Sequence, residues 1–248
     1  MKRILVCSDT HCGAATGLTP PAWQTTELQA TLWSIFRGWI VEYAPYNSLI
    51  LNGDLIDGTD ARGGGTEQIT TDRLKQCEIA SEIIQGIECN DIHIVAGTPY
   101  HVGNSEDFER VIAGNVGAKF HDRGFFSVNG VEINCKHYIS GSALPHTRLT
   151  PLAREILQNR QWFLEGTEPL ANVIIRSHVH HYEQIDHDGC LGFITPGLQS
   201  LGSKYGARIC SGVIHFGFLI LNISDKGNVT WVAPRAVGTT QRVESLVL

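Results

Sequence analysis

The sequence predicts an α/β fold in which two β-sheets pack face to face and helices cover their outer faces. Up to about residue 181, short apolar runs alternate with longer amphipathic stretches, as strands and helices do. After this point the chain becomes rich in strands with turn signals between them, at residues 182–187, 191–195, 213–223 and 229–233. Because no Pro- or Ser-rich linker divides the 248 residues, we expect a single domain over 1–248.

Several stretches place apolar residues at helical spacing, and each is expected to pack on a sheet. They are residues 23–44, 66–87, 108–116 and 151–163. In the first, Leu28, Leu32 and Trp39 fall on one face of a helix. Pro151 suits the first turn of the last one, after Thr150. We interpret these apolar side chains as core rather than as a cofactor site.

Five apolar runs end in metal-binding side chains. The runs are residues 4–7, 48–52, 92–96, 131–135 and 172–176, and after them come Asp9, His11, Asp54, Asp57, His101, His137, His178 and His180. In an open α/β sheet, ligands bind just beyond the carboxyl ends of the strands, so these side chains should meet in one site. Gly53 should let the backbone pass close to whatever Asp54 binds.

Each of these side chains has an ordinary structural explanation when taken alone. An Asp after a strand is commonly a helix cap, and a lone His is commonly a packed or surface residue. Taken together, the five stretches predict a metal site. A set of carboxylates and imidazoles without thiolates suits Mn, Fe or Zn. Asp57 is expected to orient a ligand or cap the next segment, and His121 and His146 compete with His137 for the ligand role.

The order of these loops resembles the calcineurin-like metallophosphoesterase superfamily. Along residues 2–181 they read Asp-x-His, Gly-Asp-x-x-Asp, a Gly-Asn-His-like loop, a single His, and a Gly-His-x-His-like loop. The first two motifs match as they stand, at residues 9–11 and 53–57. The resemblance implies a sandwich of two mixed β-sheets flanked by helices, and metal-dependent hydrolysis of phosphate esters.

Two of the motifs depart from the family pattern. Where the family has Gly-Asn-His, residues 97–101 read Gly-Thr-Pro-Tyr-His, so Thr98 stands at the Asn position and His101 comes two residues late. Where the family has Gly-His-x-His, the motif begins with Ser177, a change between small residues that should spare the ligands. The Gly-Thr-x-x-His-Val-Gly form is similar to a subgroup of phage and prophage genes, which suggests such an origin.

The resemblance implies ligands for two divalent metal ions. Asp9, His11 and His180 would hold one ion, His137 and His178 the second, and the carboxylate of Asp54 would bridge both. The second ion would lack the ligand that the family's Asn supplies, and the Thr98 hydroxyl, water or His101 are its candidates. The role that we favour for His101 is beside the leaving group.

The implied chemistry depends on two cations about 3.5 to 4 Å apart. They would generate a hydroxide that attacks phosphorus, and they would neutralise charge in the transition state, while a protonated His101 assists the leaving oxygen. Thr98, Lys204 and Arg208 are candidates for substrate binding. Lys204 and Arg208 lie in the Gly-rich stretch 196–209, which is equally explained as a surface loop kept soluble by cations.

Composition narrows the substrate and the compartment. A net charge of -6 argues against an extended nucleic-acid interface and favours a small phosphate ester. Phosphodiesters are preferred on two grounds: the resemblance to the metallophosphoesterase superfamily, and the lack in the sequence of an obvious basic cage for a doubly charged terminal phosphate. The alternatives are a metal-dependent nuclease and a noncatalytic scaffold that retains the fold. The sequence has no signal-peptide core and no apolar run of membrane length, so we expect a protein without membrane contact. Its seven cysteines form no C-x-x-C pair, which agrees with reduced thiols and a cytoplasmic location.

Overall fold

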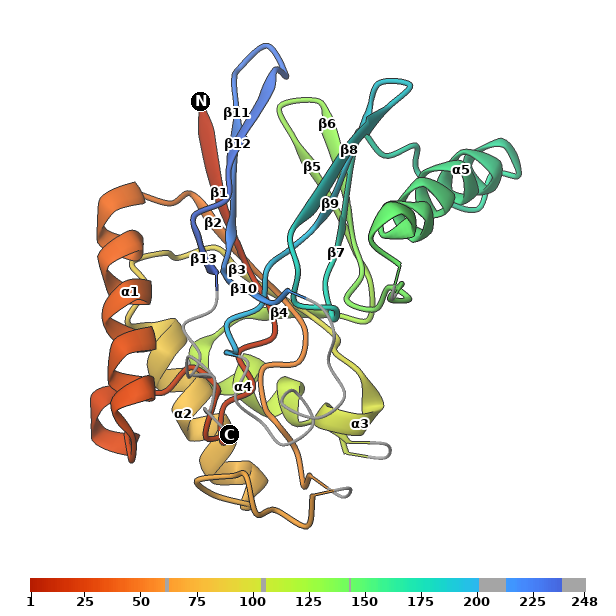
Figure 1. Ribbon diagram of the computed structural model, residues 1–248. Helices are drawn as coiled ribbons and strands as arrows, with labels where there is room; N and C mark the ends of the chain where they lie inside the picture. Colours follow the sequence, from red (N-terminus) through yellow and green to blue (C-terminus); the bar gives the residue numbers. More distant parts are fainter. Residues whose placement is uncertain (61–62, 104–105, 143, 201–212, 238–248) are drawn as a thin grey trace, which may run out of the picture.

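The computed structural model describes residues 1–60, 63–103, 106–142, 144–200 and 213–237. Within these residues, two mixed β-sheets of six and five strands pack against each other, and helices cover their outer faces (Figure 1). The fold class predicted from the sequence is therefore confirmed. A small third sheet pairs two further strands. None of the helices in the described ranges is both long and apolar enough to cross a membrane.

The six-stranded sheet has the order β12-β11-β1-β2-β3-β4. Its strands are β1 (Lys2–Cys7), β2 (Ser48–Asn52), β3 (Ile92–Val95), β4 (Lys119–His121), β11 (Leu219–Ile223) and β12 (Val229–Val232). Strands β1 to β4 are parallel, whereas β11 and β12 pair antiparallel. In β1, Leu5 packs toward the helices and Val6 toward the other sheet. Burial on both faces explains why the strand reads as an unbroken apolar run.

The five-stranded sheet has the order β5-β6-β7-β9-β8. Its strands are β5 (Gly124–Val128), β6 (Val131–Cys135), β7 (Val173–Arg176), β8 (Glu183–His187) and β9 (Cys190–Ile194). The central strands β6, β7 and β9 are parallel, and the edge strands pair antiparallel. Strands β10 (His215–Gly217) and β13 (Arg235–Val237) form the small sheet. The single strand predicted over 213–223 is thus wrong, because the chain leaves β10 at Phe218 and enters β11 of another sheet.

Helices α1 (Glu27–Tyr43), α2 (Arg73–Gln85) and α4 (Phe108–Val116) cover the six-stranded sheet, and α5 (Thr150–Leu164) covers the other (Figure 1). The single turn α3 (Pro99–Val102) and the 3-10 turns at Pro21–Trp23 and Pro145–Thr147 complete the helical elements of the described chain. Helix α1 begins at a capping box formed by Thr26 and Gln29. Helix α2 begins at Arg73 and not near residue 66 as predicted, because the Asp72 carboxylate accepts the N–H groups of Leu74 and Lys75 and caps it there.

The carboxyl ends of the parallel strands in both sheets are joined by a buried chain of hydrogen bonds. The Asn52 amide donates to the Ser177 hydroxyl at 2.7 Å. The Thr195 hydroxyl lies 2.7 Å from that of Ser177 and 2.8 Å from that of Ser8. These four side chains sit at the ends of β1, β2, β7 and β9, and Ser8, Asn52 and Ser177 lie one or two residues before a candidate ligand. The two sheets are therefore held together directly beneath the site.

Candidate metal centre

All six predicted ligands come together at the carboxyl ends of β1, β2, β6 and β7. Their ligand atoms form three overlapping sets in which all atoms lie within 4.8 Å of one another. We call Asp9, His11 and His180 the first donor group, and Asp54, His137 and His178 the second donor group; the third donor group consists of His11, Asp54 and His101. The predicted acid His101 therefore also lies at the centre.

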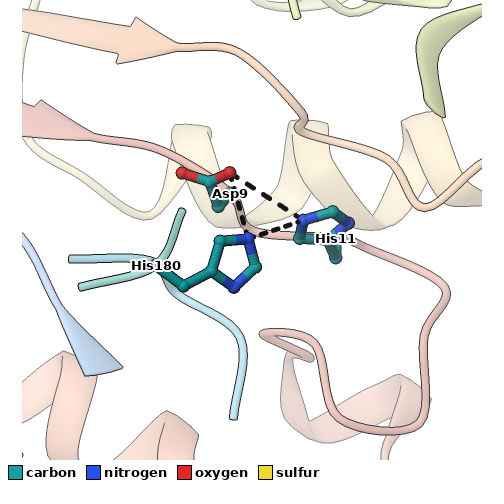
Figure 2. A group of neighbouring side chains, drawn as sticks. All are labelled: Asp9, His11 and His180. Atoms are coloured by element: carbon teal, nitrogen blue, oxygen red, sulfur yellow. Dashed lines mark hydrogen bonds and ion pairs between the residues drawn. The ribbon is translucent and has the colours of Figure 1, made fainter. Parts of the chain in front are cut away.

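The first donor group places two imidazoles beside one carboxylate (Figure 2). Asp9 Oδ1 lies 3.1 Å from His180 Nε2 and 3.9 Å from His11 Nε2, and the two Nε2 atoms are 3.3 Å apart. His11 Nδ1 faces Asp57 Oδ1 at 3.2 Å. Because a carboxylate can only accept, Nδ1 carries the proton and the lone pair of His11 Nε2 points into the group. This contact is the one expected of Asp57 as an orienting residue.

The second donor group is built around His137 and Asp54, whose side chains lie closer together than those of the first group. His137 Nδ1 lies 2.6 Å from the backbone oxygen of Asn52, so Nδ1–H donates and Nε2 carries the lone pair of the neutral ring. That Nε2 faces Asp54 Oδ2 at 2.9 Å, and His178 Nδ1 lies 3.8 Å from the same oxygen. Two buried acceptors at 2.9 Å require a proton or another cation between them. The donor set thus fits a divalent metal ion.

The buried carboxylates and imidazoles perturb one another strongly. Burial by itself would lower the pKa of His137, but the carboxylates of Asp54 and Asp9 outweigh it and raise the pKa to about 10. Burial would likewise raise the pKa of Asp9, but His180 and His137 hold this pKa well below its usual range. Without a metal ion, therefore, protons supply the positive charge that balances the carboxylates.

Metal binding is expected to release protons. The proton on His137 has to leave before Nε2 can bind an ion, and a pKa raised to about 10 keeps the ring protonated near neutral pH in the metal-free protein. Each displaced proton makes the affinity rise by about tenfold per pH unit as the pH increases toward that pKa. Calorimetric titration with Mn²⁺ in buffers of different ionisation enthalpy would count the protons. An affinity that stays constant between pH 6 and pH 8 would contradict this balance.

Backbone hydrogen bonds align the first two ligand loops. The N–H of Asp9 donates to the oxygen of Gly53 at 3.0 Å, and the N–H of His11 donates to the oxygen of Asp54 at 3.1 Å. At Gly53, with φ +82°, an added Cβ would lie 2.6 Å from the His137 ring. The backbone at this glycine therefore passes close to His137, a predicted ligand, and its approach to whatever Asp54 binds stays a prediction.

Most of the predicted ligand residues adopt a backbone conformation that L-amino acids rarely occupy. Five of the six have a positive φ between 42° and 76°, namely Asp9, His11, Asp54, His178 and His180. Each costs roughly 1 to 3 kcal/mol relative to a relaxed backbone, and such conformations cluster at functional sites. The burial and hydrogen bonding of the loops maintain this strain, which aims the side chains inward.

Thr98 lies behind the proposed bridging carboxylate. Its N–H donates to Asp54 Oδ1 at 2.6 Å, and its hydroxyl lies 3.0 Å from both carboxylate oxygens. The residue at the family's Asn position therefore fixes the orientation of Asp54. Substrate contact by Thr98 remains a prediction. Lys204 and Arg208, the other two candidates for substrate binding, lie outside the described residues.

His101 lies on the side of the first donor group. Its Nδ1 is 2.9 Å from the backbone oxygen of Asp57, so Nε2 faces the centre, 4.0 Å from Asp54 Oδ2. The His101 and His11 rings meet edge to face with centroids 4.5 Å apart. Among the described residues, His101 shares a donor group with His11 and Asp54 but not with His137 and His178. As a ligand, His101 would serve the ion next to His11 rather than replace the missing Asn at the other ion.

Neither competitor of His137 joins the centre. His121 Nε2 lies 3.0 Å from His93 Nδ1, where β3 and β4 run side by side. His146 is exposed in the 3-10 turn Pro145–Thr147. Within the described part of the chain, neither belongs to a set of side chains that could hold an ion. The structure therefore places His137 alone of the three at the centre.

Sequence reasoning missed Glu109, which links two loops of the centre. This side chain is 0% exposed. Its Oε1 accepts the N–H of Leu55 at 3.0 Å and its Oε2 accepts the N–H of Gly97 at 2.7 Å. Burial and then the charge of Asp54 raise the pKa of Glu109 to about 8, against the lowering effect of the two N–H groups. An acid on the same helical face as Ile112 and Ala113 was the available signal.

Glu109→Gln is expected to weaken metal binding without unfolding the chain. A carboxamide has one acceptor oxygen, so one of the two backbone N–H groups loses its partner and the loop of Asp54 or of Thr98 is released. We expect a loss of about 10- to 100-fold in metal affinity. Titration with Mn²⁺ would measure it, with the exposed Glu88→Gln as a matched control. Unchanged affinity in Glu109→Gln would remove this residue from the centre.

The comparisons with known proteins give remote structural likenesses only. A structure titled as a novel archaeal phosphodiesterase has a TM-score of 0.47 and 12% identity, covering 94% of this chain and 99% of that one. Vps29 from Entamoeba histolytica complexed with Zn has a TM-score of 0.45 and 13% identity, with 94% and 98% covered. A predicted phosphoesterase from Streptococcus pneumoniae has a TM-score of 0.42 and 12% identity, with 96% and 98% covered.

No protein-family model matches the chain, and no curated protein sequence matches it.

Proposed function

We propose that this protein hydrolyses phosphate esters, with phosphodiesters preferred, at a centre of two divalent metal ions. The observation that carries the proposal is that the second and third donor groups share Asp54, with His137 Nε2 and Asp54 Oδ2 facing each other at 2.9 Å. Buried acceptors in this arrangement bind cations. Mn, Fe and Zn suit the mixed oxygen and nitrogen donors, and we expect the protein to act in the cytoplasm.

The side chains divide into holding and proton-transfer roles. The first donor group would hold one ion and His137 with His178 the other, with Asp54 between them. Bound there, the ions would supply Lewis-acid charge for the phosphate oxygens and activate the attacking water. Asp57 fixes the ring of His11 through Nδ1, and its backbone oxygen fixes that of His101. The Nε2 of His101 therefore faces the centre, where it can give a proton to the leaving oxygen.

The charge around the centre supports a diester rather than a monoester. Among the ion pairs of the described residues, Asp9, Asp54 and Asp57 pair only with histidines and with no lysine or arginine. A monoester carries a second negative charge, which fixed cationic side chains would normally balance. A diester with a single negative charge needs less compensation. The substrate we propose is therefore a small phosphodiester.

The function is tested by comparing two esters that share a leaving group. With Mn²⁺ present, we expect a higher kcat/KM for bis(p-nitrophenyl) phosphate than for p-nitrophenyl phosphate, and we expect a chelator to abolish both. No turnover of either ester by a metal-replete sample would reject the enzyme and favour the scaffold. Rapid degradation of long DNA, with affinity that falls steeply as salt rises, would instead favour the nuclease.

His101→Ala tests the proposed acid. Both ions should remain bound, and turnover should fall by about 100-fold or more for alkyl leaving groups of high pKa but little for p-nitrophenolate, which needs no proton. Burial and then His11 lower the pKa of His101, so the assisted reaction should also slow as pH rises. The exposed His146→Ala is the matched control. Loss of one metal equivalent with an equal defect on every substrate would make His101 a ligand.

A further inference from the structure

Two exposed tyrosines border the metal centre. Tyr100 is 45% exposed and its ring centroid lies 4.9 Å from that of His101. Tyr138 is 51% exposed and its ring centroid lies 4.9 Å from that of His178. Nitrogens of both histidines face the same atom, Asp54 Oδ2, at 4.0 and 3.8 Å. Aromatic rings from α3 and from the loop after β6 therefore stand next to the place where phosphate would bind.

Both tyrosines are held in position by buried neighbours. Tyr100 lies in α3, between Thr98, which donates to Asp54, and the buried Val102. The Tyr100 ring is therefore exposed on a segment that is anchored on both sides.

Tyr138 is fixed in the same way. Its neighbours on each side, His137 and Ile139, are both buried. With the chain anchored on both sides, its ring has to project at the surface beside His178. Exposed rings next to a catalytic centre, rather than scattered over the surface, are typical of a ligand-binding surface.

We propose that Tyr100 and Tyr138 bind a planar aromatic group of the substrate, so that the substrate class is an aryl or nucleoside phosphodiester. This inference rests on the proposed function and adds the group that flanks the phosphate. Aromatic rings stack on tyrosine faces whatever their substituents. A net charge of -6 fits a small aromatic ester better than a long nucleic-acid chain.

Binding of two phosphonates tests the inference without turnover. Methylphosphonate and phenylphosphonate present a similar anionic head, and their C–P bonds resist hydrolysis. We expect the Mn²⁺-loaded protein to bind phenylphosphonate at least about fivefold more tightly in calorimetric titration, as stacking on one aromatic ring would give. Equal affinity for the two phosphonates would overturn the inference, whether or not the protein hydrolyses phosphate esters.

Variants test whether the rings of Tyr100 and Tyr138 cause the preference for phenylphosphonate over methylphosphonate. Tyr100→Leu and Tyr138→Leu keep an apolar side chain but remove the aromatic face, and each should reduce the phenyl-to-methyl affinity ratio toward one. Phe163→Leu is the control, because Phe163 is 47% exposed on α5, the helix that covers the other sheet. Thermal unfolding would verify that the variants fold. A ratio that persists in the double variant would show that other residues bind the aromatic group.

Kinetics with esters that share one leaving group identify which kind of aromatic group the substrate carries. Methyl, phenyl and thymidine-5′ esters of p-nitrophenyl phosphate differ only in the retained group. We expect KM to be lower for the phenyl and thymidine esters than for the methyl ester. A lower KM for the thymidine ester than for the phenyl ester indicates a nucleobase, and the reverse indicates a simple aryl group. If the phosphonate preference holds but no ester is hydrolysed, the proposed function fails and the aromatic site remains.

Discussion

Asp54→Asn is expected to remove most bound metal and to lower phosphodiester turnover by at least about a thousandfold, while the fold stays intact. The variant loses the negative charge that the second and third donor groups share, and a neutral carboxamide is a poor bridge between two cations. Its oxygen still accepts the hydrogen bonds of Thr98, so the loop should keep its conformation. Metal analysis after gel filtration and the rate with bis(p-nitrophenyl) phosphate are the measurements.

Asp186→Asn makes the same chemical change at an exposed position of β8 and serves as the control. It should retain the metal content and turnover of the unmodified protein. If Asp54→Asn also retained them, the bridging role assigned to Asp54 would be wrong.

His180→Ala and His178→Ala are expected to lose different ions. His180 belongs to the first donor group with Asp9 and His11, whereas His178 belongs to the second with Asp54 and His137. Each variant should therefore retain about one of two metal equivalents, and turnover should fall by about 100-fold or more, because one ion cannot clamp both the attacking and the leaving oxygen. Metal analysis under limiting Mn²⁺ gives the stoichiometry. Retention of both equivalents in either variant would reject that ligand.

The sequence predicted the fold best where the chain is buried on both faces. The apolar runs of β1 and β2 are unbroken because one side of each strand packs on helices and the other on the second sheet. Helix α4 was predicted over its full length, because the residues with helical spacing in the sequence span the same range as the helix. The prediction of helix from residue 66 was wrong because tertiary pairing overrides periodicity there. Ile69 donates its N–H to the oxygen of Gly13, which holds 66–72 against the first ligand loop.

Strands β4 and β5 were not predicted from the sequence. Strand β4 has three residues at the edge of its sheet, so no pattern marks it. Strand β5 did have a signal, since Asn129 and Gly130 both have positive φ in the turn to β6. An Asn-Gly pair between two strands is a strong hairpin signal. The break between β10 and β11 depends on which sheet each part joins, and local sequence does not specify this.

The side chains that converge at the centre could be named from the sequence because strand ends converge at one edge of each sheet. Their orientation could not be predicted, since it depends on contacts between distant segments. Glu109 is 54 residues from Leu55 and 12 from Gly97, whose N–H groups it accepts. The side of the centre on which His101 lies likewise follows from its contact with the Asp57 backbone. Convergence of predicted ligands is visible in a sequence, whereas the residues that orient them become visible only in the fold.

The most direct test of the two-metal centre is a crystal of the protein soaked in Mn²⁺ and measured for anomalous scattering. Our account predicts two anomalous peaks separated by the carboxylate of Asp54, one contacted by Asp9, His11 and His180, the other by His137 and His178. A single peak, no peak, or a peak only beside the His93 and His121 pair would contradict it.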